Sequence, residues 1–428
     1  MKKIEPKILK GTREFLPADK AKRDIVLEKI LSIFKKFGYD SIETPVLCPA
    51  ETILGKYGDE GEKLTYNFID NGGRGVALPY DQTVPFARLV AANSNNLPMP
   101  FKRYQTSRVW RADKPQKGRY REFRQCDIDI IGSKSLICEA EIAKLTATVF
   151  EELGFKQFQI KFNSRRLLSD ILGYFQIPGP QQKKVIQTID KLAKIGEQNV
   201  VIILKDLGID KANEIIELLK PEKDNQATLK KLSKFDISEI KEFMEYCANF
   251  DINEKFLKFD PSLARGLDYY TGINYEVYST EADYGALAAG GRYDDLCGMF
   301  CNKNLSGVGI AFGFDRIVLG MEQLGKLDEI KTNSQVMVTI FDKDSIKNSL
   351  NLYNSLTDAG INSEIYFEPA KLSKQFKFAN KKGIPFVVIQ GPEEMNKKQI
   401  AIKNMNTGDQ KTIPEDQLSS YINNYYNA

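Results

Sequence analysis

Two short runs rich in glycine, arginine and tyrosine restrict most strongly how this chain can fold. Residues 265–272 read Arg-Gly-Leu-Asp-Tyr-Tyr-Thr-Gly, and residues 290–294 read Gly-Gly-Arg-Tyr-Asp. Glycine lets a backbone approach a ligand closely, arginine offers a rigid planar fork to carboxylate or phosphate, and tyrosine supplies an apolar wall with a polar tip. This mixture suits a site for a small, polar, aromatic and partly anionic ligand.

The chain has no histidine in 428 residues. No imidazole can therefore serve as a base, a proton shuttle or a metal ligand, which excludes Ser-His-Asp hydrolysis, Cys-His proteolysis and His-ligated zinc chemistry. The six cysteines are scattered and too sparse for a disulfide scaffold, so we expect a reducing cytoplasm. The close pair Cys297 and Cys301 is either half of a metal site or two buried thiols. With no second pair and no histidine, we predict that the protein builds no metal site of its own.

The length of the chain exceeds what one hydrophobic core supports, so two or more domains are expected. No apolar run is long enough to cross a bilayer, and the N-terminal residues lack the apolar core of a signal peptide. A net charge of +4 neither requires nor excludes nucleic acid, because a local patch matters more than the sum.

Arginine is concentrated near the glycine- and tyrosine-rich motifs, whereas lysine supplies most positive charge elsewhere. Residues 167–264 and 317–428 contain no arginine. This clustering favours sites that need bidentate geometry, although chance in a lysine-biased genome is the alternative. Eight arginines lie between positions 74 and 124: Arg74, Arg88, Arg103, Arg108, Arg111, Arg119, Arg121 and Arg124.

Hydrophobic periodicity predicts a helix over residues 18–37, followed by a strand over 39–43. Residues 64–132 are expected to alternate short strands with charged loops. Within this stretch, two strand-like runs at 103–110 and 120–131 flank a flexible basic loop.

Further along, a helix is predicted over 135–153, and lysine-rich helices are predicted over 165–250, where they resemble a helical insertion. Residues 255–313 return to strands and turns, and Arg316 opens an amphipathic helix. Beyond a polar linker at 326–334, alternating strands and helices predict a small domain on a mostly parallel sheet. Its strands are expected at 336–341, 361–366, 384–389 and 399–403, and its helices at 345–359 and 372–382.

The strand-like runs on either side of the basic loop predict an antiparallel hairpin with one functional face. Alternate residues of a strand share a side, so Phe123, Gln125 and Asp129 are expected on one face together with Arg111. An arginine-rich hairpin of this kind binds either a nucleotide or RNA phosphates, and the pattern alone leaves both open.

The runs at 265–272 and 290–294 are similar to the two signature segments of histidyl-tRNA synthetases. Residues 18–45 resemble the first motif of class II aminoacyl-tRNA synthetases, although many α/β proteins share this helix–strand pattern. Residues 103–129 resemble the second motif, and the glycine-rich residues 307–316 resemble the third.

The resemblance covers nearly the whole chain and implies an α+β fold. It implies a class II catalytic core over residues 1–325, an antiparallel sheet flanked by helices, with a helical insertion at about 165–250. After the linker at 326–334, it implies an α/β anticodon-binding domain over 335–428, which residues 372–386 match well. A homodimer is also implied by the family.

Residues 78–88 match the family segment that holds the α-amino group of the amino acid. The resemblance implies that Asp81, Thr83 and Gln125 accept the ammonium, and that Asp129 and Tyr270 hold the two imidazole nitrogens. Glutamate often stands in the family where this chain has Asp81 or Asp129, which is a mild departure. The implied histidine-binding set is Asp81, Thr83, Arg111, Gln125, Asp129, Arg265, Tyr269, Tyr270 and Tyr293.

The same match implies an ATP site. Arg111 would grip the α-phosphate, Phe123 would stack on adenine, and Asp113 would contact its exocyclic amine. Arg119 would meet the terminal phosphates and Arg316 the γ-phosphate. The implied catalytic residues are Arg111 and Arg265, which would stabilise charge on the pentacovalent phosphorus, with Mg²⁺ on the pyrophosphate side.

The function implied by the resemblance is that of a histidine–tRNA ligase. Such an enzyme activates L-histidine with ATP to histidyl-adenylate and transfers it to the 3′ end of its tRNA. Because no protein histidine is available, the proton acceptor in transfer is either a phosphate oxygen or the substrate's own imidazole. The alternatives are a regulatory paralogue and a different class II synthetase. Regulatory paralogues usually lack the C-terminal domain and often lose the ATP arginines, both of which this chain keeps.

Overall fold

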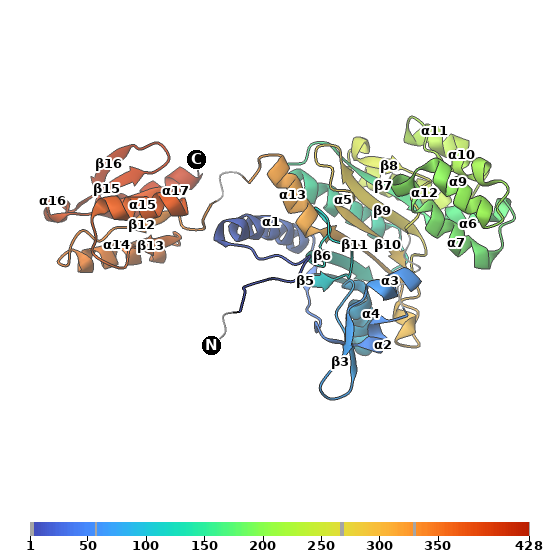
Figure 1. Cartoon of the computed structure of the whole chain (residues 1–428). Coiled ribbons are helices and arrows are strands. Elements are labelled where there is room, and N and C mark those ends of the chain that lie inside the picture. The colour runs from blue at the N-terminus through green and yellow to red at the C-terminus, as the bar shows by residue number, and fades with distance from the viewer. Residues whose placement is uncertain (1–3, 56–57, 266–268, 328–330, 428) are drawn as a thin grey trace. The chain divides into compact units, whose positions relative to one another are not determined.

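The computed structural model describes residues 4–55, 58–265, 269–327 and 331–427. The chain divides into two compact units, one formed by residues 1–13 and 26–326 and the other by 14–25 and 327–428. Each unit combines a β-sheet with helices (Figure 1), in agreement with the predicted α+β class.

The first unit is built on an eight-stranded sheet with the order β1-β5-β6-β11-β10-β9-β7-β8. The six inner strands pair antiparallel, whereas the edge strands β1 and β8 pair parallel to their neighbours. The predicted antiparallel core sheet is therefore confirmed, with a parallel strand added at each edge. The bounds are β1 Asp40–Ser41, β5 Phe101–Trp110, β6 Glu122–Ile131, β7 Phe158–Ser164, β8 Leu257–Phe259, β9 Ile273–Ser279, β10 Ala288–Tyr293 and β11 Gly307–Gly313.

Helices cover this sheet through aromatic contacts. Phe34, near the end of α1 (Pro17–Lys36), packs against Tyr104 of β5 and Phe312 of β11, with ring centroids 5.8 and 5.5 Å away. The ring centroid of Phe150 in α5 (Ile137–Glu152) lies 5.3 Å from that of Phe158 in β7. The third helix, α13 (Phe314–Gln323), follows β11 directly. These contacts fix the strands that carry the site.

The predicted helical insertion is present as a group of short helices beside β7 and β8 (Figure 1). It begins where the Ser164 hydroxyl accepts hydrogen bonds from the backbone N–H groups of Arg166 and Leu167, which caps the first helix. The helices are α6 Arg165–Tyr174, α7 Gly179–Ile189, α8 Leu192–Ile195, α9 Glu197–Asp206, α10 Ala212–Leu219, α11 Asn225–Lys231 and α12 Ser238–Asn249.

Residues 64–132 differ from the prediction because they include a helix, α4 (Thr83–Asn93). Its buried residues Val84, Ala87 and Val90 follow helical spacing, but Pro85 within the run obscured the pattern. Proline is tolerated there because the first turn of a helix has no internal partner for its backbone nitrogen. Two other short helices and a small sheet lie between residues 48 and 77: α2 Ala50–Ile53, α3 Gly58–Leu64, and strands β2 Cys48–Pro49, β3 Asn67–Ile69 and β4 Gly75–Ala77 in the order β2-β4-β3.

The second unit contains a five-stranded sheet with the order β13-β12-β14-β15-β16. The prediction of a mostly parallel sheet was wrong, because two pairs are parallel and two are antiparallel. The last two strands follow each other as a hairpin, and a hairpin requires antiparallel pairing. The elements are β12 Val336–Val338, α14 Ile346–Asp358, β13 Ser363–Ile365, α15 Leu372–Lys382, β14 Phe386–Ile389, α16 Pro392–Asn396, β15 Gln399–Asn404, β16 Gln410–Pro414 and α17 Leu418–Asn427.

Two separate apolar clusters stabilise this second sheet. One includes Val336, Val388 and Ile402, and the other includes Met337, Val387 and Ala401. Successive residues of a strand point to opposite faces, so both faces of the sheet are covered. Among the described residues of the whole chain, no helix has the length and apolar character needed to cross a membrane.

Candidate active site

A cavity opens on one face of the large sheet. Its floor consists of small residues on neighbouring strands, including Gly309 and Ala311 of β11 and Ala289 and Gly291 of β10. Every residue predicted to bind the amino acid lines this cavity: Asp81, Thr83, Arg111, Gln125, Asp129, Arg265, Tyr269, Tyr270 and Tyr293. Residues 266–268 of the first signature run lie outside the described residues.

A second, larger cavity of about 470 Å³ is lined by all the residues predicted to bind ATP: Arg111, Asp113, Arg119, Phe123 and Arg316. Arg111, Gln125 and Arg265 line both cavities, as do two alanines of the floor. A ligand in one cavity would therefore meet a ligand in the other beside two guanidinium groups. Such an arrangement suits a reaction that joins a carboxylate to a phosphate.

Glycines are required in the floor because side chains fill the space above them. A Cβ added at Gly309 would lie 2.0 Å from Asp129 Oδ1, and one added at Gly307 would lie 2.4 Å from the Tyr293 ring. Gly309 and Asp129 are directly paired in the β6–β11 ladder. Because Gly309 and Gly307 have no side chains, the Asp129 carboxylate and the Tyr293 ring can occupy the space above them.

Asp129 is a buried acidic group of the smaller cavity. It is 3% exposed, pairs with Arg103 Nη2 at 2.5 Å through Oδ2, and accepts a hydrogen bond from Tyr293 Oη through Oδ1. Burial raises the pKa of Asp129 to about 6, while Arg103 and the Tyr293 hydroxyl act in the opposite direction. Asp129 is therefore largely ionised at neutral pH and can accept a further hydrogen bond.

Asp127 lies two residues earlier on the same face of β6 and was not predicted as a site residue. It is 2% exposed and lines the smaller cavity, and neither of its carboxylate oxygens has a hydrogen-bond partner among the described residues. Burial raises its pKa well above the ordinary value, and Arg103 opposes this effect. The alternation of side chains along the strand could have identified Asp127, since it has the same spacing as Gln125 and Asp129.

The first turn of α4 fixes the Asp81 carboxylate at another wall of the smaller cavity. Asp81 Oδ1 accepts hydrogen bonds from the backbone N–H groups of Thr83 and Val84, at 3.0 and 3.2 Å. Its other oxygen accepts a hydrogen bond from the Tyr269 hydroxyl at 3.5 Å. These bonds hold the Asp81 carboxylate in place at the wall of the smaller cavity.

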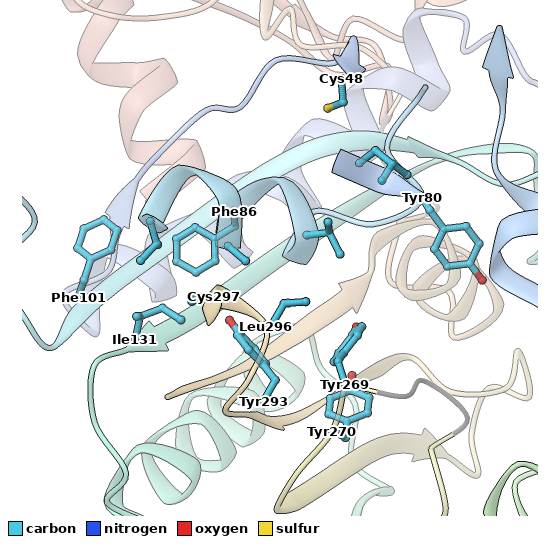
Figure 2. Packing of buried hydrophobic residues seen from close by; sticks show 14 of the residues in the cluster. Cys48, Tyr80, Phe86, Phe101, Ile131, Tyr269, Tyr270, Tyr293, Leu296 and Cys297 are labelled. Carbon is cyan, nitrogen blue, oxygen red and sulfur yellow. The ribbon is translucent and has the colours of Figure 1, made fainter. Parts of the chain in front are cut away.

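Three tyrosines form the apolar wall (Figure 2). Tyr269 packs against Tyr270 at 4.8 Å and edge-on against Tyr293 at 6.2 Å between ring centroids. The same apolar cluster extends to Phe86 of α4 and Leu296, so the wall is part of a packed core. A rigid aromatic wall suits a flat ring as ligand.

The two guanidinium groups shared by the cavities are held by neighbours. Arg111 donates from Nε to the Tyr80 carbonyl at 3.0 Å and lies between the rings of Tyr80 and Phe123, 4.1 and 5.2 Å from their centroids. Arg265 forms an ion pair with Glu276 of β9, which was not predicted as a site residue. Tyr80 and Glu276 therefore anchor the two guanidinium groups where the two cavities adjoin.

The larger cavity is lined by five cationic side chains and four carboxylates, and four of the cations are guanidinium groups. Arg316 donates to the carbonyls of Gly118 and Ala286 at 3.0 and 2.8 Å, and Arg119 forms a bidentate pair with Asp113. Burial, Arg119 and Arg111 all lower the pKa of the Arg316 guanidinium. Several guanidinium groups in one cavity favour a polyanion such as a triphosphate. Asp190 and Lys194 of the helical insertion also line this cavity.

Arg292, in the second signature run, does not line either cavity. It is 3% exposed and donates two hydrogen bonds to the Glu139 carboxylate, from Nε and Nη2. This bidentate geometry is the one that clustered arginines were expected to supply. Here, however, it joins β10 to α5 and does not contact a ligand cavity. Cys297 and Cys301 are free thiols, and the described residues contain no cluster of three or more residues able to hold a metal ion.

Comparisons with known proteins agree with this geometry. A family model described as histidyl-tRNA synthetase matches residues 11–317, and one described as anticodon binding domain matches residues 335–425. A histidine–tRNA ligase of Christiangramia forsetii is 38% identical over 459 residues, covering 98% of this chain and 99% of that protein. One of Cytophaga hutchinsonii is 38% identical over 448 residues, with 97% and 98% covered. The crystal structure of histidyl-tRNA synthetase from Nostoc sp. PCC 7120 is similar with a TM-score of 0.89 and 31% identity, covering 99% and 100%.

Proposed function

Because this chain belongs to the histidyl-tRNA synthetase family, we propose that its smaller cavity binds histidine and its larger cavity binds ATP. The chain is an aminoacyl-tRNA synthetase that ligates histidine to tRNA. The assignment of the two cavities rests on one observation: both are lined by Arg111 and Arg265, so their ligands meet at these two cations.

We propose that the smaller cavity recognises each polar group of histidine. Asp81, Thr83 and Gln125 accept the α-ammonium, and Asp129 accepts the imidazole Nδ1–H while Tyr270 holds the other ring nitrogen. Tyr269 and Tyr293 wall the ring. An amino acid without two ring nitrogens leaves buried acceptors unpaired, which costs roughly 10⁴-fold or more in rate, so no editing step is needed.

In the first step, the histidine carboxylate attacks the α-phosphorus of ATP and pyrophosphate leaves. Arg111 and Arg265 stabilise the negative charge that builds on the phosphorus, and they need little movement because Tyr80 and Glu276 already hold them. Phe123 supports the adenine ring, Asp113 contacts its amine, and Arg119 and Arg316 bind the terminal phosphates.

A divalent metal accompanies ATP in this family, and we propose Mg²⁺ here. Mg²⁺ is usually bound through substrate phosphates and one or two carboxylates, without a protein cage. The residues present fit that mode: four carboxylates line the larger cavity, Asp113, Asp190, Glu276 and Asp315, and among the described residues no three of them gather into a metal cage. When bound, the metal would neutralise charge on the leaving pyrophosphate.

In the second step, the terminal adenosine hydroxyl of tRNA attacks the carbonyl of histidyl-adenylate. With no histidine side chain in the protein, we propose that a phosphate oxygen or the substrate's imidazole accepts the hydroxyl proton. Gln116 and Lys117, in the loop between β5 and β6, are proposed to contact the acceptor end. Residues 335–428 are proposed to bind the anticodon.

We also propose a homodimer in the cytoplasm. Exposed apolar side chains, such as Phe68 and Ile69 on β3, are the kind of surface that a second copy would cover. The free thiols suit a reducing compartment.

Histidine-dependent ATP–pyrophosphate exchange tests the proposed function. Exchange with histidine alone, among the twenty amino acids, is the expected result. Folded protein that gives no exchange would indicate a regulatory paralogue, and exchange driven by another amino acid would indicate a sister enzyme. The retained ATP arginines and the anticodon-domain match argue against the regulatory role.

A further inference from the structure

The structure buries one arginine completely behind the histidine cavity. Arg103 of β5 has 0% exposure and lies directly opposite Asp129 in the β5–β6 ladder. Its guanidinium carbon lies 4.2 Å from the centroid of Phe86, so the fork stacks on an aromatic face of α4. Arg103 does not line either cavity, and nothing in the proposed mechanism uses it.

Two carboxylates share this single buried cation. Asp129 pairs with Arg103 at 2.5 Å, whereas Asp127 has no hydrogen-bond partner among the described residues and feels Arg103 only through its charge. Two buried carboxylates side by side resist ionising together unless a cation compensates them. Without the cation, at least one would hold a proton at neutral pH.

We propose that Arg103 is a positioning residue for histidine recognition: it is the shared counter-ion that keeps Asp129 ionised beside Asp127. This inference rests on the proposed role of Asp129. An ionised Asp129 can only accept, so it matches the imidazole Nδ1–H. A protonated Asp129 would present an O–H donor toward another donor, and histidine would lose a buried hydrogen bond.

Arginine suits this position better than lysine because its planar fork stacks on Phe86. The other titratable or charged groups that act on Asp129 are few. They are Tyr293 of β10 and Asp81 before α4. The Asp129 charge in turn raises the pKa values of Asp127 of β6, Tyr39 after α1, and Cys297.

The test compares histidine dissociation constants of Arg103→Met, Arg103→Lys and wild type by calorimetry at pH 7, 8 and 9. Arg103→Met should bind histidine about tenfold more weakly at pH 7, and the ratio to wild type should fall toward one at pH 9, where Asp129 ionises without help. Arg103→Lys should show a ratio that does not change with pH. The matched control is Arg108→Met on the same strand, whose arginine is exposed and pairs with Glu122. The KM for ATP should stay within about twofold of wild type in all three variants.

The double variant Arg103→Met/Asp127→Asn provides an independent arm if Arg103→Met is recovered unfolded, because it leaves one buried carboxylate without the cation instead of two. Asp127 holds its proton where Asp129 titrates, so Asp127→Asn alone should leave histidine binding in acid unchanged, and the double variant should show the same pH-dependent loss as Arg103→Met. A ratio to wild type that is the same at every pH, in Arg103→Met or in the double variant, overturns the inference. Asp129→Asn distinguishes a failure of the Arg103 inference from a failure of the proposed histidine site. If Asp129→Asn binds histidine as tightly as wild type, the proposed role of Asp129 is wrong, whatever Arg103 does.

Discussion

Asp113 accepts two parallel hydrogen bonds from the Arg119 guanidinium, at 2.9 Å from Nε and 2.8 Å from Nη2. Both residues were predicted to bind ATP, yet here they bind each other. For Asp113 to reach adenine and Arg119 to reach phosphates, the pair has to separate when the nucleotide enters. Asp113 thus holds the loop arginine at the larger cavity until a stronger anion competes for it.

Arg119→Ala should therefore raise the KM for ATP about tenfold, because a charge-assisted contact to phosphate is lost, while the KM for histidine changes little. Steady-state pyrophosphate exchange at varied ATP and varied histidine measures both. The matched control is Arg74→Ala, which removes another Arg–Asp pair, with Asp70, from an exposed turn. Equal effects on the two substrates would show that Arg119 is not specific to the nucleotide.

Gly309→Ala should strongly impair histidine binding. The added Cβ would lie 2.0 Å from Asp129 Oδ1 and 2.6 Å from the Ile128 carbonyl, so the carboxylate must move. Overpacking of this kind costs about 1–3 kcal/mol, which corresponds to about 5- to 150-fold in affinity if the strain falls on the bound state. Calorimetric titration with histidine and thermal unfolding measure the two effects. Gly298→Ala is the control, since a Cβ there meets no atom within 4 Å, and the same loss in both variants would contradict the steric argument.

The residues predicted for the site from the resemblance and from strand alternation line the two cavities, and many of them sit on long strands. The antiparallel pair β5–β6 and the strand–helix junction at β11–α13 were expected from alternation and glycine spacing. The sheet of the second unit was expected to be mostly parallel because strands and helices alternate along that part of the chain. Periodicity does not describe which strands become neighbours, and β15 pairs antiparallel with both β14 and β16.

Other site features depend on pairing register, which a single sequence does not reveal. Arg103 became relevant only when its position opposite Asp129 was known, and Glu276 only when it was found paired with Arg265. Asp127 was visible in the strand pattern, but its lack of a partner was not. The roles assigned to the site residues remain predictions for the variants described here.

Asp127→Asn should stabilise the protein at neutral and alkaline pH. Burial raises the Asp127 pKa, so the native state holds its proton more strongly than the unfolded state does. Native stability therefore falls as pH rises from about 4 toward the native pKa, and remains lowered above it. Asparagine lacks this penalty, so its gain in unfolding free energy should be about 1–3 kcal/mol at pH 8 and small near pH 4.

Urea unfolding of wild type and Asp127→Asn at pH 4.5, 6 and 8 checks this sign. Asp260→Asn is a suitable comparison, because that buried carboxylate is paired with Lys161 at 3.1 Å. Its substitution should destabilise the protein, since it breaks a pair. A loss of stability in Asp127→Asn at pH 8 would mean that Asp127 has a partner that stabilises its charge.

A fragment of residues 1–326 should separate amino-acid activation from tRNA charging. The described residues that line both cavities all precede position 317, and the residues after 326 have apolar clusters of their own. Histidine-dependent pyrophosphate exchange should remain within about threefold of the full chain. Aminoacylation should fall about 100-fold or more in kcat/KM for tRNA, because one of two linked binding contacts is lost. The control is a full-length chain with lysine-to-alanine changes confined to α15, which should weaken tRNA binding and leave exchange intact. If the fragment charged tRNA as well as the full chain does, residues 335–428 would not be the anticodon-binding part.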